Sequence, residues 1–540
     1  MKRILLLILV GFFLFACKEK KEVDLLVMNA KIYTVDENFS IRQSFVVNDG
    51  KILEIGEFGK LELRYTPEKT YDVDGKFVFP GFIDAHAHFY GLGLQQQKVD
   101  LTGTKSFAEV VERIQTFQKK NNSNFITGRG WDQNDWEKQE FPTNDTLNRL
   151  FPNTPIIINR IDGHVLLANK IALQKAGIST QTKIEGGEII QENGKLTGVL
   201  IDNAMTLMNK IIPNPTPKEK ISALKAAEKI CLDYGLTTVD DAGLERETIE
   251  LIDSLQKANE LNMRIYAMVA NSSKNVEYYL KKGIYKTPKL NVRSFKVYAD
   301  GALGSRGAAL KKSYTDKDKH FGSLLINPKK FKTLAGKISK SDFQMNMHAI
   351  GDSANAMVLR TYDSVLKKQN DRRWRIEHAQ IIDEPDFKYF SNNIFPSVQP
   401  THATSDMYWA NLRLGKERLK NAYAYKRLLK QTGKIALGTD FPIENVNPLL
   451  TFYAAISRKD TSGYPEDGFQ KSQALSREEA LRGMTIWAAY ANFEEKEKGS
   501  IEVGKYADFV VLDRDIMTIP EKDIPNVKVL ATYIDGKKAN

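Results

Sequence analysis

Residues 81–89 read Gly-Phe-Ile-Asp-Ala-His-Ala-His-Phe and follow the apolar residues 77–79, Phe-Val-Phe. The stretch ends in His86 and His88, and side chains two positions apart project from the same face of a strand. One metal ion could therefore contact both imidazoles, which are common ligands of zinc and similar ions. The alternative is that both are polar residues at the end of an edge strand. The positions of the other histidines decide between these interpretations.

Short apolar segments alternate with helix-like patterns through the middle of the chain. Helix starts are marked by a capping box at residues 106–109 and by Pro217 after Thr216. Eight strands are predicted, at residues 77–83, 236–239, 263–270, 292–298, 343–347, 374–377, 394–398 and 434–437. Strands and helices in this order predict an α/β fold, a (β/α)₈ TIM barrel.

Two parts of the chain fall outside this alternation. Residues 90–215 are too many for a simple crossover and contain a hairpin that turns at Asn193-Gly194, so we expect a subdomain inserted after the first strand. Both chain ends carry short alternating strands, which predicts a small β-sandwich built from residues 23–76 and 499–540. The barrel, with its insert, would then occupy residues 77–498.

Three further residues of metal-ligand type lie at predicted strand ends. His348 ends the fifth strand, His378 ends the sixth, and Asp440 follows the eighth. Such strand ends converge on the mouth of a barrel, where the active sites of this fold lie. Each residue alone could be a core or capping residue. Four histidines and one carboxylate at the strand ends of one barrel favour a metal site.

These motifs resemble those of the amidohydrolase superfamily, in particular its branch of N-substituted formamide deformylases. Four further blocks carry the resemblance, at residues 128–132, 160–164, 300–306 and 347–352. The resemblance implies a hydrolase that cleaves a non-peptide C–N bond, of amide or formamide type, through a metal-activated water. Asp440 would be the catalytic base, and the cofactor one or two divalent ions, with zinc expected. The implied metal ligands are His86, His88, Lys296, His348, His378 and Asp440.

Lys296 lies on the predicted fourth strand, where related amidohydrolases carry a lysine carboxylated by CO₂ that bridges two metal ions. The reaction requires a neutral amine and hence a lysine pKa lowered by burial and nearby cations. The alternative is an unmodified lysine that pairs with Asp300 or reaches solvent.

Substrate contacts are expected from residues of the family blocks and from the histidine that follows the seventh strand. Trp131 could equally belong to the core of the insert, and Arg306 could be a structural ion-pair partner. His320 falls in a polar loop and is expected to have no chemical role. The expected substrate-binding residues are Trp131, His164, Asp300, Arg306 and His402.

Two other functions use the same features. A metal-dependent deaminase of a cyclic amidine-type substrate would need almost the same ligands, and their spacing does not exclude it. A non-catalytic, lipid-anchored binding protein could keep the fold without turnover. The complete ligand set argues against the binding protein, because binding alone does not require Asp440.

The first residues have the pattern of an export signal. Lys2 and Arg3 precede an apolar run at residues 4–15, which suits the core of a signal peptide better than a membrane span. Leu14-Phe15-Ala16-Cys17 then resembles a bacterial lipobox. We expect residues 1–16 to be removed and Cys17 to be lipidated, at the start of a charged tether, residues 17–22. This predicts an exported, membrane-anchored lipoprotein of the bacterial cell envelope; an ordinary secretory signal or an uncut anchor is the alternative.

Composition agrees with a large folded protein. The chain has 540 residues, of which 42% are hydrophobic and 27% charged. Its net charge of +11 comes without a long Lys/Arg run interleaved with aromatic residues, so nucleic-acid binding is not expected. The expected partners are a small-molecule amide and, through the lipid anchor, a membrane. A homodimer remains open.

Overall fold

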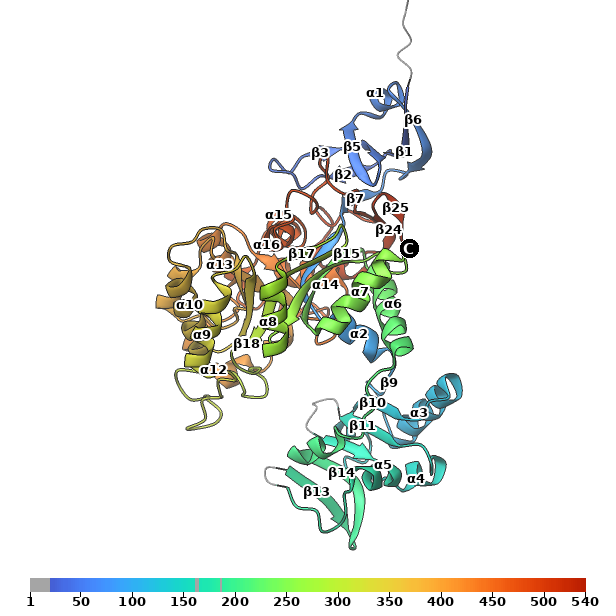
Figure 1. Cartoon of the computed structure of the whole chain (residues 1–540), viewed down its shortest axis with the longest axis vertical. Coiled ribbons are helices and arrows are strands. Elements are labelled where there is room, and N and C mark those ends of the chain that lie inside the picture. Colours follow the sequence, from blue (N-terminus) through green and yellow to red (C-terminus); the bar gives the residue numbers. More distant parts are fainter. Residues whose placement is uncertain (1–19, 161–164, 185–186) are drawn as a thin grey trace, which may run out of the picture. The chain divides into compact units, whose positions relative to one another are not determined.

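The computed structural model describes residues 20–160, 165–184 and 187–540. Cys17 and His164 lie outside these residues. The chain divides into two compact units, Met1–Phe89 with Glu228–Asn540, and Tyr90–Ala227. The first unit contains the barrel strands and the β-strands from both ends of the chain (Figure 1).

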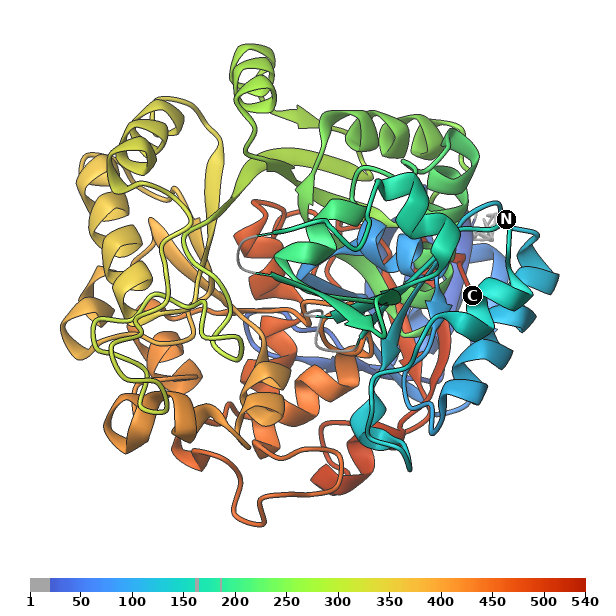
Figure 2. The same ribbon diagram turned by 90° about the horizontal axis from the view of Figure 1, so that it is seen from below.

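Eight parallel strands of the first unit pair in the order in which they occur along the chain. In Figure 2 the green, yellow and orange helices that follow these strands lie around the outside. The predicted barrel of eight parallel strands is confirmed, and it is nearly closed. Its strands are β8 (Phe82–Ala87), β15 (Leu236–Leu244), β16 (Arg264–Ala270), β18 (Leu290–Tyr298), β19 (Gln344–Ala349), β20 (Trp374–His378), β21 (Ile394–Val398) and β22 (Ala436–Leu437).

Hydrogen bonds join β8 to the segment that follows β22, between the two ends of the nearly closed barrel sheet. The backbone N–H of Asp440 donates to the carbonyl oxygen of His86 at 2.7 Å. The buried carboxylate of Asp84 accepts from the backbone N–H of Thr439 at 3.0 Å and from its hydroxyl at 2.6 Å. β8 is therefore joined to the residues that follow the last barrel strand by side-chain as well as backbone hydrogen bonds.

The helices of this unit start where the sequence supplies caps. At α9 (Pro328–Ile338) the side chain of Asn327 accepts from the N–H groups of the first turn, and proline occupies the first position. The same helix buries Phe331, Ala335 and Ile338, which share one face. The other helices around the barrel are α7 (Arg246–Lys257), α8 (Ser273–Lys282), α10 (Asp352–Leu366), α11 (Pro400–Asp406), α12 (Ala410–Leu419), α13 (Tyr425–Thr432), α14 (Pro448–Ser457), α15 (Arg477–Gly483) and α16 (Ile486–Ala491).

The first predicted strand, residues 77–83, is in fact two strands of different sheets. β7 (Phe77–Pro80) pairs outside the barrel with β2 (Lys31–Tyr33) and β23 (Phe509–Leu512), whereas β8 enters the barrel. The chain changes sheet at Gly81, where a Cβ atom would collide with the side chain of Thr237. The absence of a side chain therefore allows the close approach of the two segments.

Strands from both ends of the chain form two sheets that share one core. Phe45 and Phe509, from opposite ends of the chain, meet edge to face with ring centroids 5.2 Å apart. The first sheet has the order β5 (Lys51–Gly56), β4 (Ser44–Asn48), β1 (Lys21–Met28), β6 (Tyr65–Asp72). The second has the order β25 (Lys537–Lys538), β24 (Val529–Ile534), β23, β7, β2, β3 (Ile41–Arg42).

A buried arginine of the barrel binds this β-rich part. Arg264, on β16, donates from Nε to Asp508 at 2.6 Å and also pairs with Asp535. Its side chain is 1% exposed, so its charge depends on these two carboxylates for compensation.

The second unit is built on a six-stranded sheet. Helix α3 (Phe107–Asn121) begins at Ser106, whose side chain accepts from the N–H of Glu109, and α4 (Asp145–Leu150) and α5 (Lys170–Ala176) follow. α2 (Phe89–Gln95) and α6 (Pro217–Asp233) lie at the boundaries of the unit. The strand order is β13 (Gly187–Glu192), β14 (Lys195–Asp202), β12 (Val165–Ala168), β11 (Ile156–Arg160), β10 (Ile126–Trp131), β9 (Val99–Asp100).

No helix in the described part of the chain is both long and apolar enough to cross a bilayer.

Candidate metal centre

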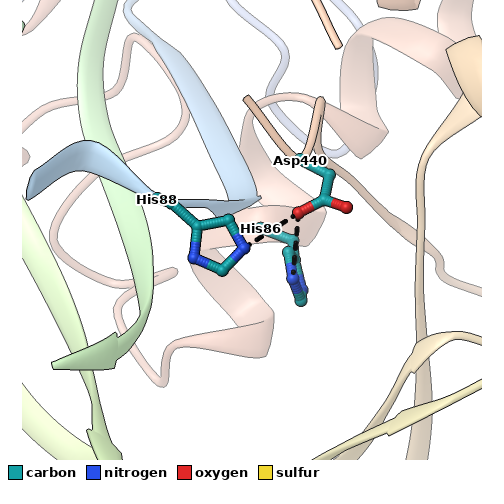
Figure 3. A group of neighbouring side chains, drawn as sticks. All are labelled: His86, His88 and Asp440. Carbon is teal, nitrogen blue, oxygen red and sulfur yellow. Dashed lines mark ion pairs between the residues drawn. The ribbon is translucent and has the colours of Figure 1, made fainter. Parts of the chain in front are cut away.

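Two histidines and one carboxylate meet at the C-terminal end of β8 (Figure 3). Oδ1 of Asp440 lies 3.1 Å from Nε2 of His88 and 3.5 Å from Nε2 of His86. The side chain of His86 is fully buried, whereas 30% of the His88 side chain is exposed. The group is therefore open to solvent on the side of His88, as a site that must admit water and substrate requires.

Two further histidines lie near the other oxygen of the same carboxylate. Nε2 of His402 is 3.6 Å from Oδ2 of Asp440. The rings of His402 and His378 stack, with centroids 5.7 Å apart and planes inclined by 14°. His378, His402 and Asp440 form a second group whose potential ligand atoms all lie within 4.8 Å of one another. Asp440 thus belongs to both groups.

The chemistry of these residues fits a divalent cation. Burial lowers the pKa of His86 and His378 well below the ordinary range, and that of His348 to about 3, so these imidazoles are neutral, the form that binds metal. Burial alone would raise the pKa of the Asp440 carboxyl, but its contacts with the surrounding imidazoles, His88 first, hold it well below its usual value. Within the described residues, Nε2 of His402 is buried without a hydrogen-bond partner.

Three acceptors orient the imidazole rings from behind. Nδ1 of His86 lies 2.6 Å from Glu377 Oε2, and Nδ1 of His378 lies 2.7 Å from Gln399 Oε1. Nδ1 of His88 lies 3.1 Å from the carbonyl oxygen of Ala242. With Nδ1 engaged in this way, each ring keeps Nε2 for a ligand, the arrangement in which metal-binding histidines are usually held.

Residues 69–539 match the sequence model of the amidohydrolase family. The chain belongs to the amidohydrolase family. The N-substituted formamide deformylase of Arthrobacter pascens is 27% identical over 538 residues, with 95% of this chain and 97% of that protein covered. Protein LONG AFTER FAR-RED 3 of Arabidopsis thaliana is 33% identical, and the match covers 95% of this chain and 91% of that protein.

A solved structure is similar along almost its whole length. It is an uncharacterized metal-dependent hydrolase from Pyrococcus horikoshii OT3, with 28% identity and a TM-score of 0.79, and the match covers 92% of this chain and 99% of that one. This amidohydrolase is therefore a metal-dependent hydrolase that acts on C–N bonds.

Lys296 of the amidohydrolase lies beside the first group. Its Nζ is 2.9 Å from Nε2 of His86, and the residue is 1% exposed. Burial lowers the pKa of Lys296 to about 8, although the charges of Glu377 and Asp440 oppose this change. Lys296 therefore does not reach solvent, contrary to one of the expected alternatives, and its amine is partly neutral near pH 8.

His348 and Asp300 are close neighbours at the end of β19. The His348 ring lies 4.5 Å from that of His378, yet His348 is in neither of the two groups. Asp300 was expected to bind substrate. The structure shows its carboxylate buried and accepting hydrogen bonds from the backbone N–H groups of Ala309, Ile350 and Gly351. Asp300 therefore fixes the loops around His348, and its oxygens are already engaged.

Two other expected substrate contacts have structural partners. The Trp131 side chain is fully buried in the core of the second unit, where its Nε1 donates to the carbonyl oxygen of Ile158 at 3.0 Å. Arg306 pairs with Asp316 at 2.8 Å. Both observations agree with the structural alternatives for these residues. His164 lies outside the described residues, and His402 lies in the second group rather than apart from the ligands.

Sequence reasoning missed the residues that orient the imidazoles. Strand alternation places Glu377 on the face opposite His378, so its position in the sequence did not indicate a contact with the metal-binding histidines. His378 has a φ of +73°, so regular alternation ends there. Gln399 and the Ala242 carbonyl carried no sequence signal.

Proposed function

We propose that this amidohydrolase is a zinc-dependent enzyme that hydrolyses the amide or formamide-type C–N bond of a small N-substituted molecule. The observation that carries the proposal is the position of Asp440, whose two carboxylate oxygens lie 3.1 Å from His88 and 3.6 Å from His402. The similarity to N-substituted formamide deformylase supports the substrate class.

The groups of this chain have separate tasks in such a reaction. A divalent ion held by the histidines would lower the pKa of water from about 15.7 toward roughly 7 and polarise the substrate carbonyl. The carboxylate of Asp440 is ionised at neutral pH, because its contacts with the imidazoles hold its pKa below the usual value. In this state it would accept a proton from the attacking water. Asp440 would then pass the proton to the departing nitrogen, which leaves poorly as an anion.

Lys296 is proposed to be carboxylated. Its amine is buried 2.9 Å from Nε2 of His86, and its pKa is lowered to about 8, which provides the neutral amine that reacts with CO₂. The resulting carbamate would add one negative charge beside the histidines and offset the charge of bound cations.

A turnover screen tests the reaction. Zinc-loaded protein is incubated with N-formyl, N-acyl and cyclic amide compounds, and the products are identified by mass spectrometry. Release of a carboxylate and an amine supports the proposal. Ammonia released from a ring would instead identify a deaminase, and zinc binding without any turnover would indicate a binding protein.

We also propose that the enzyme is a lipoprotein of the bacterial cell envelope, anchored through Cys17. The support is the sequence Leu14-Phe15-Ala16-Cys17 after an apolar run. The test compares membrane association of the wild type with that of Cys17→Ala in a bacterial host. Equal membrane association of both would contradict the lipid anchor. A homodimer stays a prediction, to be checked by light scattering.

A further inference from the structure

Tyr298 is the last residue of β18 and follows Lys296 by two positions. Side chains two positions apart share one face of a strand, so both project from the same face of β18. The ring centroid of Tyr298 lies 5.1 Å from Nζ of Lys296 and 5.5 Å from the ring centroid of His348. A phenol group therefore stands beside the candidate metal centre.

We propose that the Tyr298 hydroxyl donates a hydrogen bond to the carbonyl oxygen of the substrate and to the oxyanion that this oxygen becomes during hydrolysis. Tyr298 would then be a catalytic residue in addition to Asp440. The inference rests on the proposed function, because it names a group that would bind the carbonyl of an amide or formamide-type substrate.

The hydroxyl of Tyr298 lies over the end of β15. A Cβ atom added to Gly243 would be 3.6 Å from the Tyr298 oxygen. The preceding residue, Ala242, provides the carbonyl oxygen that contacts Nδ1 of His88. Because β16 lies between β15 and β18 in the sheet, the Tyr298 side chain reaches past one strand toward the backbone that orients His88.

This hydroxyl is available to a ligand. Tyr298 is 40% exposed, and no residue in the described part of the chain forms a hydrogen bond with its hydroxyl. The buried Tyr362, in contrast, donates to the carbonyl oxygen of Met345 at 3.0 Å. Tyr425, also buried, donates to the carbonyl oxygen of Gln399 at 2.9 Å. Tyr298 thus differs from these two tyrosines, because its hydroxyl does not hold the fold together.

The course of the reaction gives such a hydroxyl a task. When water adds to the carbonyl carbon, the C–O double bond becomes a single bond and its electron pair moves to the oxygen. A hydrogen bond to this oxygen strengthens as the negative charge grows, so it lowers the barrier more than it tightens substrate binding. The double bond re-forms when the C–N bond breaks. A phenol, whose ordinary pKa is about 10, keeps its proton at neutral pH through both steps, while Asp440 carries the proton from water to nitrogen.

Tyr298→Phe removes one oxygen atom and keeps the ring. Loss of one donor to an oxyanion usually lowers kcat by a factor of about 10²–10³. With the best compound of the turnover screen, kcat should fall by about this factor, whereas KM should change little. Tyr278→Phe is the control, because Tyr278 lies on the outer helix α8 under the guanidinium group of Arg246, and this variant should keep the wild-type rate.

A tetrahedral inhibitor provides a second readout. A phosphonamidate analogue of the same compound carries a charged oxygen where the oxyanion would form. Its Ki should therefore rise in Tyr298→Phe by about the factor by which kcat/KM falls. Zinc content after gel filtration should equal that of the wild type. A purely structural role of the ring would leave kcat and Ki unchanged, because phenylalanine retains the ring.

Three outcomes would overturn the inference and leave amide hydrolysis standing. They are wild-type kcat and Ki in folded Tyr298→Phe, a loss of rate that a loss of zinc accounts for, and an equal loss of rate in Tyr278→Phe. The absence of amide turnover from the wild type itself is a different result, because it would overturn the proposed function and this inference together.

Discussion

Oε2 of Glu377 lies 2.6 Å from Nδ1 of His86, and both side chains are fully buried. Arg375 lies 3.8 Å from Oε1 of Glu377 and donates to Asp240 at 2.8 Å. The side chains of Arg375 and Asp240 are also fully buried. Buried charges therefore extend through the barrel interior to the histidines. In such a position a carboxylate fixes the ring of its histidine and increases the basicity of the metal-binding nitrogen.

Glu377→Gln should weaken zinc binding by about 10- to 100-fold, the usual effect of changing a carboxylate behind a metal-binding histidine. The variant keeps a hydrogen-bond acceptor and removes the charge. Chelator competition measures the affinity. Glu384→Gln is the control, because Glu384 pairs with Arg427 at the surface. Equal zinc affinity of Glu377→Gln and wild type would contradict a role in orienting His86.

Asp440→Asn should lower turnover by a factor on the order of 10²–10⁴, the usual cost of losing a general base. The fold should be unchanged, because the backbone N–H of Asp440 still donates to His86. Rates are measured with the best compound of the screen, and circular dichroism checks the fold. Near-normal turnover of Asp440→Asn would show that another group accepts the proton.

Asp406→Asn should become more stable relative to wild type as pH rises from about 4 to 6. Burial raises the pKa of Asp406 from 3.8 to about 6, so the folded wild type retains a proton that the unfolded chain has lost. Wild-type stability therefore falls over this range, by roughly 3 kcal/mol for such a change in pKa. Asparagine can still accept from Tyr423 and Gln380 without a charge. The difference in Tm between the two proteins, measured at several pH values, should grow with pH and level off above 6; a constant difference would contradict this assignment.

Arg264→Ala should destabilise the protein by about 3–5 kcal/mol, because it leaves two carboxylates near the barrel without their buried partner. Thermal unfolding measures the effect. Lys229→Ala is the control: its ion pair with Asp233 is exposed and should contribute roughly 0.3–0.5 kcal/mol. Similar Tm values for the two variants would show that Arg264 does not stabilise the junction.

The barrel was predictable because its buried strands are short apolar runs with clear boundaries. The run at residues 394–398 coincides with β21, and the run at residues 374–377 extends by one residue in β20. The change of sheet at Gly81 could not be predicted, because apolar residues stand on both sides of this glycine and hydropathy does not show which sheet a residue joins.

The candidate site was predictable where ligands lie at strand ends and less so elsewhere. His86 and His88 follow from spacing, but His402 lies on α11, beyond the end of β21, and its approach to Asp440 depends on how that helix packs. For Trp131 the family motif identified the residue but not its role. Only the structure shows that its side chain is buried in the core and does not lie in the candidate site.

The side-chain hydrogen bond from Thr439 to Asp84 connects residues that are 355 positions apart in the sequence. Loop closure over such a distance is entropically costly, and folds that depend on such non-local contacts form slowly. During synthesis the first strand of the barrel, with His86 and His88, cannot meet Asp440 until 440 of the 540 residues have been made. A nascent chain that ends before residue 440 therefore has an open sheet edge and no complete metal-binding group. Until Asp440 is made, that edge must be protected from pairing with other chains.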